Sequence, residues 1–257
     1  MTITQAILLA IIQGLTEWLP ISSSGHLAIA QQLLGLNPPL IFDVTLHLGT
    51  LTVVLIAFRK DITNILKALT KRDFQTPQGK TAIYIATGSI PIAVIALTFY
   101  DTIKSLFSNL TAIAIALIIT GCILFVSEKR VGTKKMNTTD SILIGLAQAI
   151  AIIPGISRSG TTVSTALLRK IDKTTAFKYS FLLSIPAVIG ATILEAKDLV
   201  TGNIDLAPLL VGAIVSMLVG YASLKLLQKI VINQKLHLFA YYCWTAGTAI
   251  LVFILFH

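Results

Sequence analysis

Six long stretches of the chain contain few or no charged residues, and each is about as long as a membrane-crossing α-helix, which needs roughly 20 apolar residues. The mean hydropathy of the chain is +0.85. Only 12% of its residues are charged, against about 25% in soluble domains. The sequence therefore predicts an all-α polytopic membrane protein with six full transmembrane helices in one transmembrane domain, 1–257. The stretches are 40–58, 81–99, 110–127, 175–194, 207–227 and 237–256.

Most of the 20 lysines and arginines lie in every second connection between these stretches. Basic residues crowd 59–80, 129–135 and 169–178, whereas the connections around Lys104 and Lys197 also contain acidic residues. Strongly basic loops stay on the cytoplasmic side of a membrane. The net charge of +9 is therefore interpreted as topology and contact with anionic membrane lipids, and no nucleic-acid partner is expected.

Two polar runs interrupt the apolar pattern, and they align with each other without gaps. They are Gln13–His26 (QGLTEWLPISSSGH) and Gln148–Thr161 (QAIAIIPGISRSGT). Each run places hydroxyl groups, a glycine and a proline inside a hydrophobic segment. An unpaired polar group there costs several kcal/mol unless it is buried in protein or lines a cavity. The two runs are therefore predicted to form the two halves of one internal polar site.

Each polar run divides its segment into two pieces that are too short to span a membrane. The alternation of basic loops places both ends of residues 1–37 outside the cytoplasm and both ends of residues 139–170 inside it. We therefore expect two re-entrant helical hairpins, 3–36 and 139–170, whose breaks meet near mid-membrane. Repeat 1, about 1–130, and repeat 2, about 138–257, then each contain one hairpin and three spans. Such inverted-topology repeats are common in transporters.

The break in the first run brings a carboxylate close to a row of hydroxyl groups. Gln13 and Glu17 are four residues apart and share a helix face, and His26 is expected to open the second half-helix. Together, Glu17, the serines and His26 can supply a nucleophile, a base or a ligand for a hard cation such as Mg²⁺. The helix before the break ends at Pro20, which is followed by Ser22, Ser23, Ser24 and Gly25.

In the second run an arginine, Arg158, replaces the middle serine of the turn. The unpaired N–H groups of a helix N-terminus suit a phosphate, and a guanidinium can bind a phosphate through two parallel hydrogen bonds. A charge at membrane depth costs about 2.5–3.5 kcal/mol on insertion scales and usually marks function. The predicted phosphate-binding residues are Arg158, Ser157, Ser159, Ser22, Ser24, Gly25 and Gly160.

Four polar residues are predicted to support the site from behind. Gln13 and its counterpart Gln148 are two of them. Asp43 and His47 are the others; they lie four residues apart on the first full span and could reach the site or join two helices by a hydrogen bond. For Glu17, as for Arg158, the alternative is a buried ion pair without a chemical role.

The two motifs together resemble those of the undecaprenyl-diphosphate phosphatase family, also known as the bacitracin-resistance protein family. The matching residues extend over essentially the whole chain. They are Gln13-x-x-x-Glu17 with Leu-Pro-Ile-Ser-Ser-Ser-Gly-His26, Phe42-Asp-Val-Thr-Leu-His47-Leu-Gly49, Pro154-Gly-Ile-Ser-Arg-Ser-Gly160 and Phe181-Leu-Leu-Ser-Ile-Pro186.

The resemblance implies a bacterial inner-membrane hydrolase that converts undecaprenyl diphosphate to undecaprenyl phosphate and inorganic phosphate. It implies an active site that faces outside the cytoplasm and depends on a divalent cation, Mg²⁺ or Ca²⁺. The reaction would recycle the lipid carrier of cell-wall synthesis and give resistance to bacitracin, which sequesters the substrate. The family takes Glu or Gln at the first acidic position. Here it is Gln13, so Glu17 is the expected cation ligand, with Gln13 as a second candidate.

The roles within the first motif stay open at this point. Ser23 is the expected nucleophile, His26 is its rival, and direct attack by water is a third route. Glu17 is expected to act as base or to hold the cation. A polyprenyl-phosphate flippase or transporter is the alternative function, because it needs the phosphate site but no nucleophile. The oligomeric state, including a homo-oligomer, cannot be read from these motifs.

Overall fold

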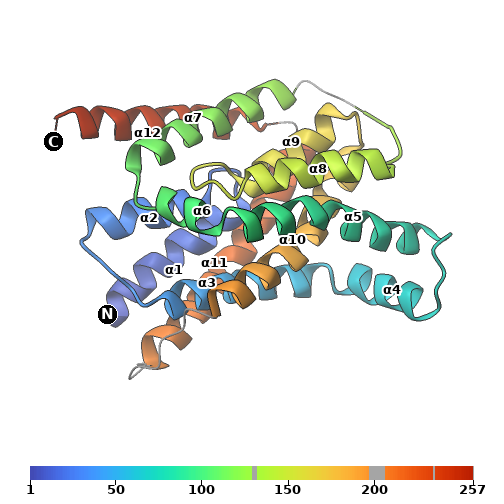
Figure 1. Ribbon diagram of the computed structural model, residues 1–257, viewed down its shortest axis with the longest axis horizontal. Coiled ribbons are helices and arrows are strands. Elements are labelled where there is room, and N and C mark those ends of the chain that lie inside the picture. Colours follow the sequence, from blue (N-terminus) through green and yellow to red (C-terminus); the bar gives the residue numbers. More distant parts are fainter. Residues whose placement is uncertain (129–131, 197–205, 234, 257) are drawn as a thin grey trace.

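The computed structural model describes residues 1–128, 132–196, 206–233 and 235–256, which form a bundle of helices (Figure 1). Within these residues six helices are long and apolar enough to cross a membrane, as predicted, and their ends lie within five residues of the predicted ones. They are α3 (Leu40–Ala57), α5 (Pro77–Thr98), α7 (Leu110–Ser127), α10 (Lys173–Ala196), α11 (Leu206–Ile232) and α12 (His237–Phe256).

The two polar runs form helical hairpins, as predicted. The first pairs α1 (Ile3–Trp18) with α2 (Ser23–Leu33), and the second pairs α8 (Thr138–Ile150) with α9 (Arg158–Leu168). The hairpins enter the bundle from opposite ends, and their turns face each other in its middle (Figure 1). The backbone N–H of Gly155 in the second turn donates a hydrogen bond of 3.0 Å to Ser22 Oγ in the first. The two halves of the polar site therefore meet.

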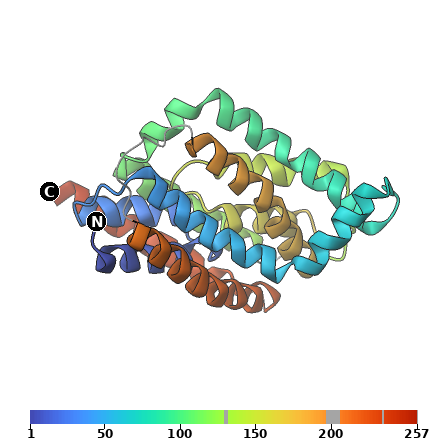
Figure 2. The ribbon, with the colours of Figure 1, turned by 90° about the horizontal axis from the view of Figure 1, so that it is seen from below.

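The N-terminal and C-terminal halves of the chain pack into each other. Helix α1 packs mainly against α11 of the other half, and its counterpart α8 packs against α5 of the first half. Helix α10 lies between α3 and α5 (Figure 2), and α7 lies along α12. Each hairpin is thus supported by a helix from the opposite half, which is the packing expected of two inverted repeats.

Small residues on α11 allow its close approach to α1 and α3. Gly212, Ser216 and Gly220 lie on one face at four-residue spacing, which is typical of close helix packing in membranes. The Ser216 hydroxyl donates to the Leu46 carbonyl of α3 over 3.2 Å. A Cβ atom on Gly14 of α1 would lie 2.9 Å from the Ser216 carbonyl oxygen. This contact holds the end of α1, and with it the first turn, in place.

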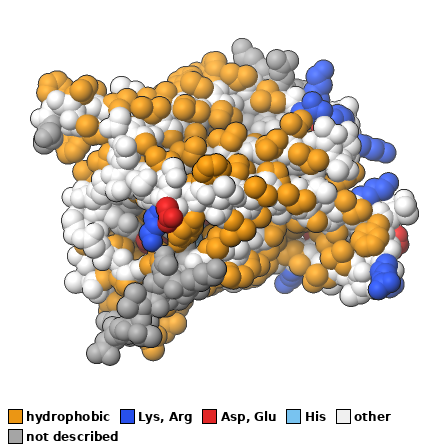
Figure 3. All heavy atoms as spheres, in the orientation of Figure 1, with side chains coloured by type: hydrophobic (Ala, Val, Ile, Leu, Met, Phe, Trp, Pro, Cys, Tyr) orange, Lys and Arg blue, Asp and Glu red, His pale blue; other side chains and the backbone are white. Residues whose placement is uncertain are grey.

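Besides the six long helices and the four hairpin helices, the described residues form two more short helices. Helix α4 (Arg59–Thr70) covers the first part of the segment 59–80, and α6 (Tyr100–Leu106) is an additional helix that the pattern of apolar stretches does not predict. Lysine and arginine side chains gather at the end of the bundle where α4, the start of α5 and the start of α8 lie (Figure 3). This distribution agrees with the predicted alternation of basic connections. The connection around Lys197 lies outside the described residues.

A buried carboxylate closes the second hairpin at this basic end. Asp140, at the start of α8, accepts hydrogen bonds from Lys134 Nζ at 2.8 and 2.7 Å and from Arg169 Nε at 2.8 Å. Its side chain is fully buried. Burial acts to raise the pKa of Asp140, but the hydrogen bonds from Lys134 and Arg169 outweigh it, so the pKa lies below the ordinary value of 3.8. This carboxylate therefore joins the start of α8 to the end of α9.

Replacing Asp140 with asparagine should lower stability at neutral pH by about 1.5–3 kcal/mol, the usual contribution of hydrogen bonds to a charged group. Because the folded-state pKa is the lower one, the carboxylate stabilises the folded protein above pH 3.8 and loses this effect as the pH falls through the folded value. In detergent, the melting temperature of the variant should lie below that of the wild type at neutral pH, and this difference should disappear in acid. A difference in melting temperature that stays constant into acid would contradict the assigned ion pairs.

Candidate active site

The first turn places Glu17 at the end of a helix that stops abruptly. Helix α1 ends at Trp18 and Leu19 is extended, because a proline at position 20 disfavours helical geometry in the residue before it. Gln13 and Glu17 are both buried on the same face of α1. The Gln13 amide donates to Glu17 Oε2 over 3.0 Å. The prediction that these two residues share a helix face is confirmed.

Ser22 sets the start of the second half-helix. Its φ of 71° lies in the left-handed region, which costs a residue other than glycine about 1–3 kcal/mol. Its hydroxyl accepts hydrogen bonds from the backbone N–H groups of Gly25 at 3.4 Å and Gly155 at 3.0 Å. Helix α2 therefore begins at Ser23, with Ser22 as its N-cap, and the prediction that His26 opens it is wrong. His26 lies one turn further along.

Glu17 is the centre of the site. Its side chain is 4% exposed, and Ser23 Oγ donates to Glu17 Oε2 over 2.5 Å. The guanidinium of Arg158 pairs with the other carboxylate oxygen, Oε1. A hydroxyl, a carboxylate and a guanidinium from the two hairpins are thus in direct contact. A hydroxyl hydrogen-bonded to a buried carboxylate is the arrangement of an activated nucleophile.

Arg158 is held in place by its helix and by an aromatic face. It is the first residue of α9, and Ser157, the N-cap, accepts a hydrogen bond of 3.2 Å from the Gly160 N–H. The Arg158 Cζ atom lies 5.3 Å from the ring centroid of Trp18, within the range of a cation–π interaction. Trp18 packs in turn on Phe181, with ring centroids 5.3 Å apart. Trp18 is absent from the predicted site, although it is the residue next to Glu17.

The other serines of the two turns are engaged with protein atoms. Ser157 Oγ lies 3.3 Å from Ser159 Oγ, and Ser159 donates to the Leu19 carbonyl of the first turn over 3.3 Å. Both serines are buried. Ser24 is half-buried, with its hydroxyl 3.3 Å from Ser22 Oγ. The contact of Ser159 with Leu19 joins the two turns, and the predicted phosphate-binding role of the serines stays a prediction.

His26 is bound on both ring nitrogens and, within the described residues, makes no hydrogen bond to Glu17. Its Nδ1 lies 2.8 Å from the Ser22 carbonyl oxygen, and its Nε2 lies 2.8 Å from the hydroxyl of Tyr242 on α12. Of the two candidate nucleophiles, Ser23 is therefore the one that touches the buried carboxylate. Tyr242 is also absent from the predicted set, because a tyrosine inside an apolar span gives no local signal of function.

Of the predicted supporting residues, two lie together at Glu17. Gln13 Nε2 lies 2.9 Å from His47 Nδ1 of α3, and that nitrogen is 3.6 Å from Glu17 Oε2. Asp43 instead accepts hydrogen bonds of 3.0 and 3.2 Å from Gln31 and so joins α3 to α2. Gln148 is fully buried. Both of its amide atoms lack a hydrogen-bond partner among the described residues, so its supporting role stays a prediction.

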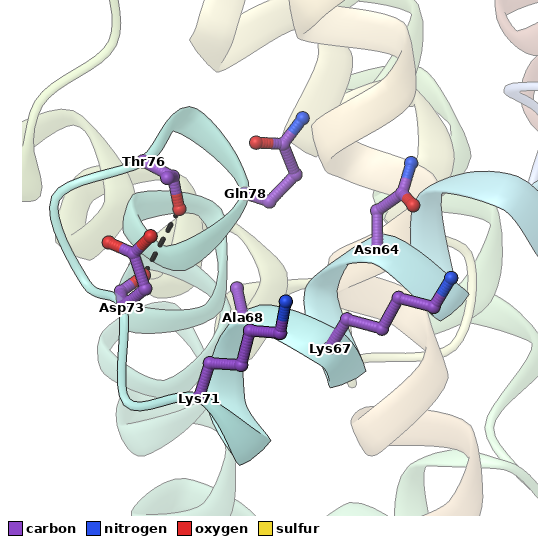
Figure 4. A pocket seen from close by; sticks show the side chains of 7 residues that line it. All are labelled: Asn64, Lys67, Ala68, Lys71, Asp73, Thr76 and Gln78. Carbon is purple, nitrogen blue, oxygen red and sulfur yellow. Dashed lines mark hydrogen bonds between the residues drawn. The ribbon is translucent and has the colours of Figure 1, made fainter.

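A separate hollow of about 290 Å³ lies near the basic end of the molecule, between α4 and the start of α5. Figure 4 shows two lysines, Lys67 and Lys71, along one wall and the amide of Gln78 on another; in the turn to their left the Thr76 hydroxyl donates to the Asp73 carbonyl over 3.0 Å. This hollow contains no hydroxyl–carboxylate pair like that of Ser23 and Glu17. The candidate active site therefore lies where the two hairpin turns meet.

Gly155 is needed where the two turns touch. Its φ is 97°, and a Cβ atom there would lie 2.4 Å from the Ile113 carbonyl oxygen. Gly155→Ala should therefore cost about 2 kcal/mol or more and lower activity, because it displaces the N–H that binds Ser22. Gly190→Ala is the matched control, since nothing lies within 4 Å of its Cβ. Melting temperature and phosphate release measure both effects, and equal behaviour of the two variants would contradict the assignment.

The chain is similar to known proteins over nearly its whole length. The model of the family described as bacitracin resistance protein BacA matches residues 6–249. An undecaprenyl-diphosphatase of Carboxydothermus hydrogenoformans is 44% identical over 258 residues, which cover 96% of each chain. Undecaprenyl-diphosphatases of Korarchaeum cryptofilum and Methanosphaera stadtmanae are 40% and 38% identical, over 98% and 95% of this chain and 99% and 95% of theirs. The chain belongs to the bacitracin resistance protein BacA family.

Proposed function

We propose that the protein hydrolyses undecaprenyl diphosphate to undecaprenyl phosphate and inorganic phosphate. The observation that carries this proposal is the contact of Ser23 Oγ with Glu17 Oε2 at 2.5 Å, with Arg158 on the other carboxylate oxygen. A flippase would need the Arg158 guanidinium to bind the phosphate, but it would not need the Ser23 hydroxyl paired with Glu17. Family membership and the names of the relatives support the hydrolase as well. Recycling of the carrier lipid and bacitracin resistance follow from this activity.

In the first half of the reaction Ser23 attacks the terminal phosphorus of the diphosphate. Glu17 accepts the proton of Ser23 Oγ as the oxygen–phosphorus bond forms, and the bond from the terminal phosphorus to the bridging oxygen breaks. Undecaprenyl phosphate leaves with the bonding electrons. Arg158 stands beside the carboxylate and binds the equatorial phosphoryl oxygens as charge builds on them. A phosphoserine and a neutral Glu17 result.

In the second half water attacks the phosphorus of the phosphoserine. Glu17 returns its proton to Ser23 Oγ, which leaves as a hydroxyl, and the water loses one proton. His26 is the proposed acceptor of that proton, because it lies three residues after Ser23 on α2 and hence on the same face of the helix. Inorganic phosphate is released, and the proton on His26 passes to solvent.

The residues present fit a divalent cation that is shared with the substrate. The Gln13 Oε1 atom is buried beside Glu17 and has no hydrogen-bond partner among the described residues. Among the described residues, no group of three His, Cys, Asp or Glu side chains is placed to hold a metal by itself. Mg²⁺ is commonly bound by one or two protein oxygens together with substrate phosphates and waters. Glu17 and Gln13 would hold it, and its charge would neutralise the diphosphate.

The proposed location is the inner (plasma) membrane, with the site open to the side away from the cytoplasm. Two features support this orientation. Lysines and arginines gather at one end of the bundle (Figure 3), and α1 and α2 enter from the opposite end. Because basic loops face the cytoplasm, the turn that carries Glu17 is reached from the other side. Ser23, Ser24 and His26 are partly exposed, as a substrate-binding turn requires.

Phosphate release by the purified protein tests the function directly. The protein in detergent should release inorganic phosphate from a long-chain prenyl diphosphate when magnesium or calcium is present, and a chelator should stop the reaction. The same protein in vesicles is then tested for movement of a labelled prenyl phosphate. Translocation without phosphate release would show that the protein is a flippase and not a hydrolase. Full activity in the presence of the chelator would contradict the cation requirement but would still support the hydrolase.

A further inference from the structure

A tyrosine from the last helix reaches the turn of the first hairpin. The hydroxyl of Tyr242 lies 2.8 Å from His26 Nε2. The two rings are stacked, with centroids 5.7 Å apart and an angle of 18° between their planes. The two residues are 216 positions apart in the chain, so the contact depends on the packing of α7, which contacts both α12 and α2. It is the hydrogen bond that joins His26 to a helix outside its own hairpin.

The partners of His26 determine which nitrogen carries its proton. The Ser22 carbonyl oxygen, 2.8 Å from Nδ1, can only accept a hydrogen bond, so Nδ1 must donate. In a neutral imidazole the lone pair then lies on Nε2, where it accepts the hydroxyl proton of Tyr242. The two contacts together fix one tautomer and one ring orientation. Without the tyrosine, only the carbonyl would hold the ring.

The helix that carries Tyr242 is itself fixed against the first turn. The neighbouring Cys243 is fully buried, and its thiol donates to the Pro20 carbonyl over 3.8 Å. Helix α12 also packs along α7. Tyr242 itself is 42% exposed, so the residue is accessible from outside the protein. A rigid helix thus presents one hydroxyl to one histidine nitrogen.

We propose that Tyr242 relays the proton of the attacking water to His26 during hydrolysis of the phosphoserine, an inference that rests on the proposed function. The tyrosine oxygen lies on the lone pair of His26 Nε2, at 2.8 Å, so a water reaches this nitrogen through the tyrosine. A hydroxyl can donate one hydrogen bond and accept another at the same time. As the water attacks, the tyrosine oxygen accepts its proton, and the hydroxyl proton of Tyr242 passes to Nε2. The next turnover begins after His26 has passed its proton to solvent.

The test compares Tyr242→Phe with Tyr241→Phe in the whole protein. Tyr241 is the matched control, because its ring packs on Phe125 and Trp244. Removal of the relay in Tyr242→Phe should lower kcat by about 10²-fold, the lower end of general acid–base effects, with KM unchanged. Nitrogen-15 NMR of histidine-labelled protein, with His26 identified by its loss in His26→Asn, should show the Nδ1–H tautomer in both proteins, because the Ser22 carbonyl sets it. The Nε2 resonance should move to higher frequency in Tyr242→Phe, since that nitrogen no longer accepts a hydrogen bond.

The outcomes separate this inference from the function itself. Wild-type kcat in Tyr242→Phe, or an unchanged Nε2 resonance, would overturn the role of Tyr242 and leave the hydrolase intact. A wild-type protein that releases no phosphate would overturn the proposed function, whereas the nitrogen-15 spectra would still report on the Tyr242 contact. A lowered kcat in Tyr241→Phe as well would assign the effect to the packing of α12 and reject the relay. Melting curves of both variants check that each is folded.

Discussion

Ser23→Ala should lower phosphate release by about 10³-fold or more, the usual cost of removing a nucleophile. The hydroxyl is the group that contacts the buried Glu17 carboxylate, at 2.5 Å, and alanine leaves no atom to carry the phosphoryl group. Substrate binding should change little, because Arg158 and the backbone N–H groups remain. The fold should also persist, since Ser22, not Ser23, caps α2. The loss is therefore expected in kcat rather than in KM.

The experiment pairs this variant with a serine remote from the site. Ser89→Ala is the control, because among the described residues the Ser89 hydroxyl donates only to the Ile85 carbonyl of its own helix, over 2.7 Å. Turnover is also quenched at neutral pH and in acid, and the labelled phosphate is mapped by mass spectrometry. Phosphate on Ser23 in both quenches is expected. Label that appears on His26 and disappears in acid would make the histidine the nucleophile, and active Ser23→Ala without trapped label would indicate attack by water.

The frame of the site could be predicted from local patterns. Long uncharged stretches indicate the six spans, since a bilayer leaves a helix few alternatives. The alignment of Gln13–His26 with Gln148–Thr161 predicts that two breaks share one site, and the Gly155–Ser22 hydrogen bond confirms it. The four-residue spacing of Gln13 and Glu17 predicts their contact, because it follows from helix geometry alone. These features depend on short stretches of sequence, where helix period and composition suffice.

The remaining features depend on contacts between distant helices. The prediction that His26 opens α2 is wrong, because the helix starts three residues earlier, after the positive φ of Ser22. A positive φ at a serine has no signal in the sequence. The aromatic face behind Arg158 and the Tyr242 hydroxyl on His26 arise from packing between helices. Uncharged spans carry little information about which face meets which neighbour. Site residues on such spans are therefore seen only in three dimensions.

Arg158→Lys should lower kcat/KM by about 10²-fold, comparable to losing one preorganised donor to the developing phosphoryl charge. Lysine keeps the positive charge but presents a single rotating ammonium, whereas the guanidinium offers two parallel N–H groups to phosphate oxygens. The planar group also stacks on Trp18, 5.3 Å away, which an ammonium does less well. The melting temperature should fall only slightly, because lysine can still pair with Glu17.

Arg158→Ala separates chemistry from structure at the same position. It leaves Glu17 buried without its cation, which should destabilise the protein by about 3–5 kcal/mol, whereas Arg158→Lys should stay folded and lose activity. Arg169→Lys is the matched control, since Arg169 also pairs with a buried carboxylate, Asp140, at 2.8 Å. If the pair of Arg158 and Glu17 were purely structural, both lysine variants would keep their activity. Near-normal phosphate release by Arg158→Lys would therefore show that the guanidinium has no role in the reaction and that its pair with Glu17 only links the two hairpins.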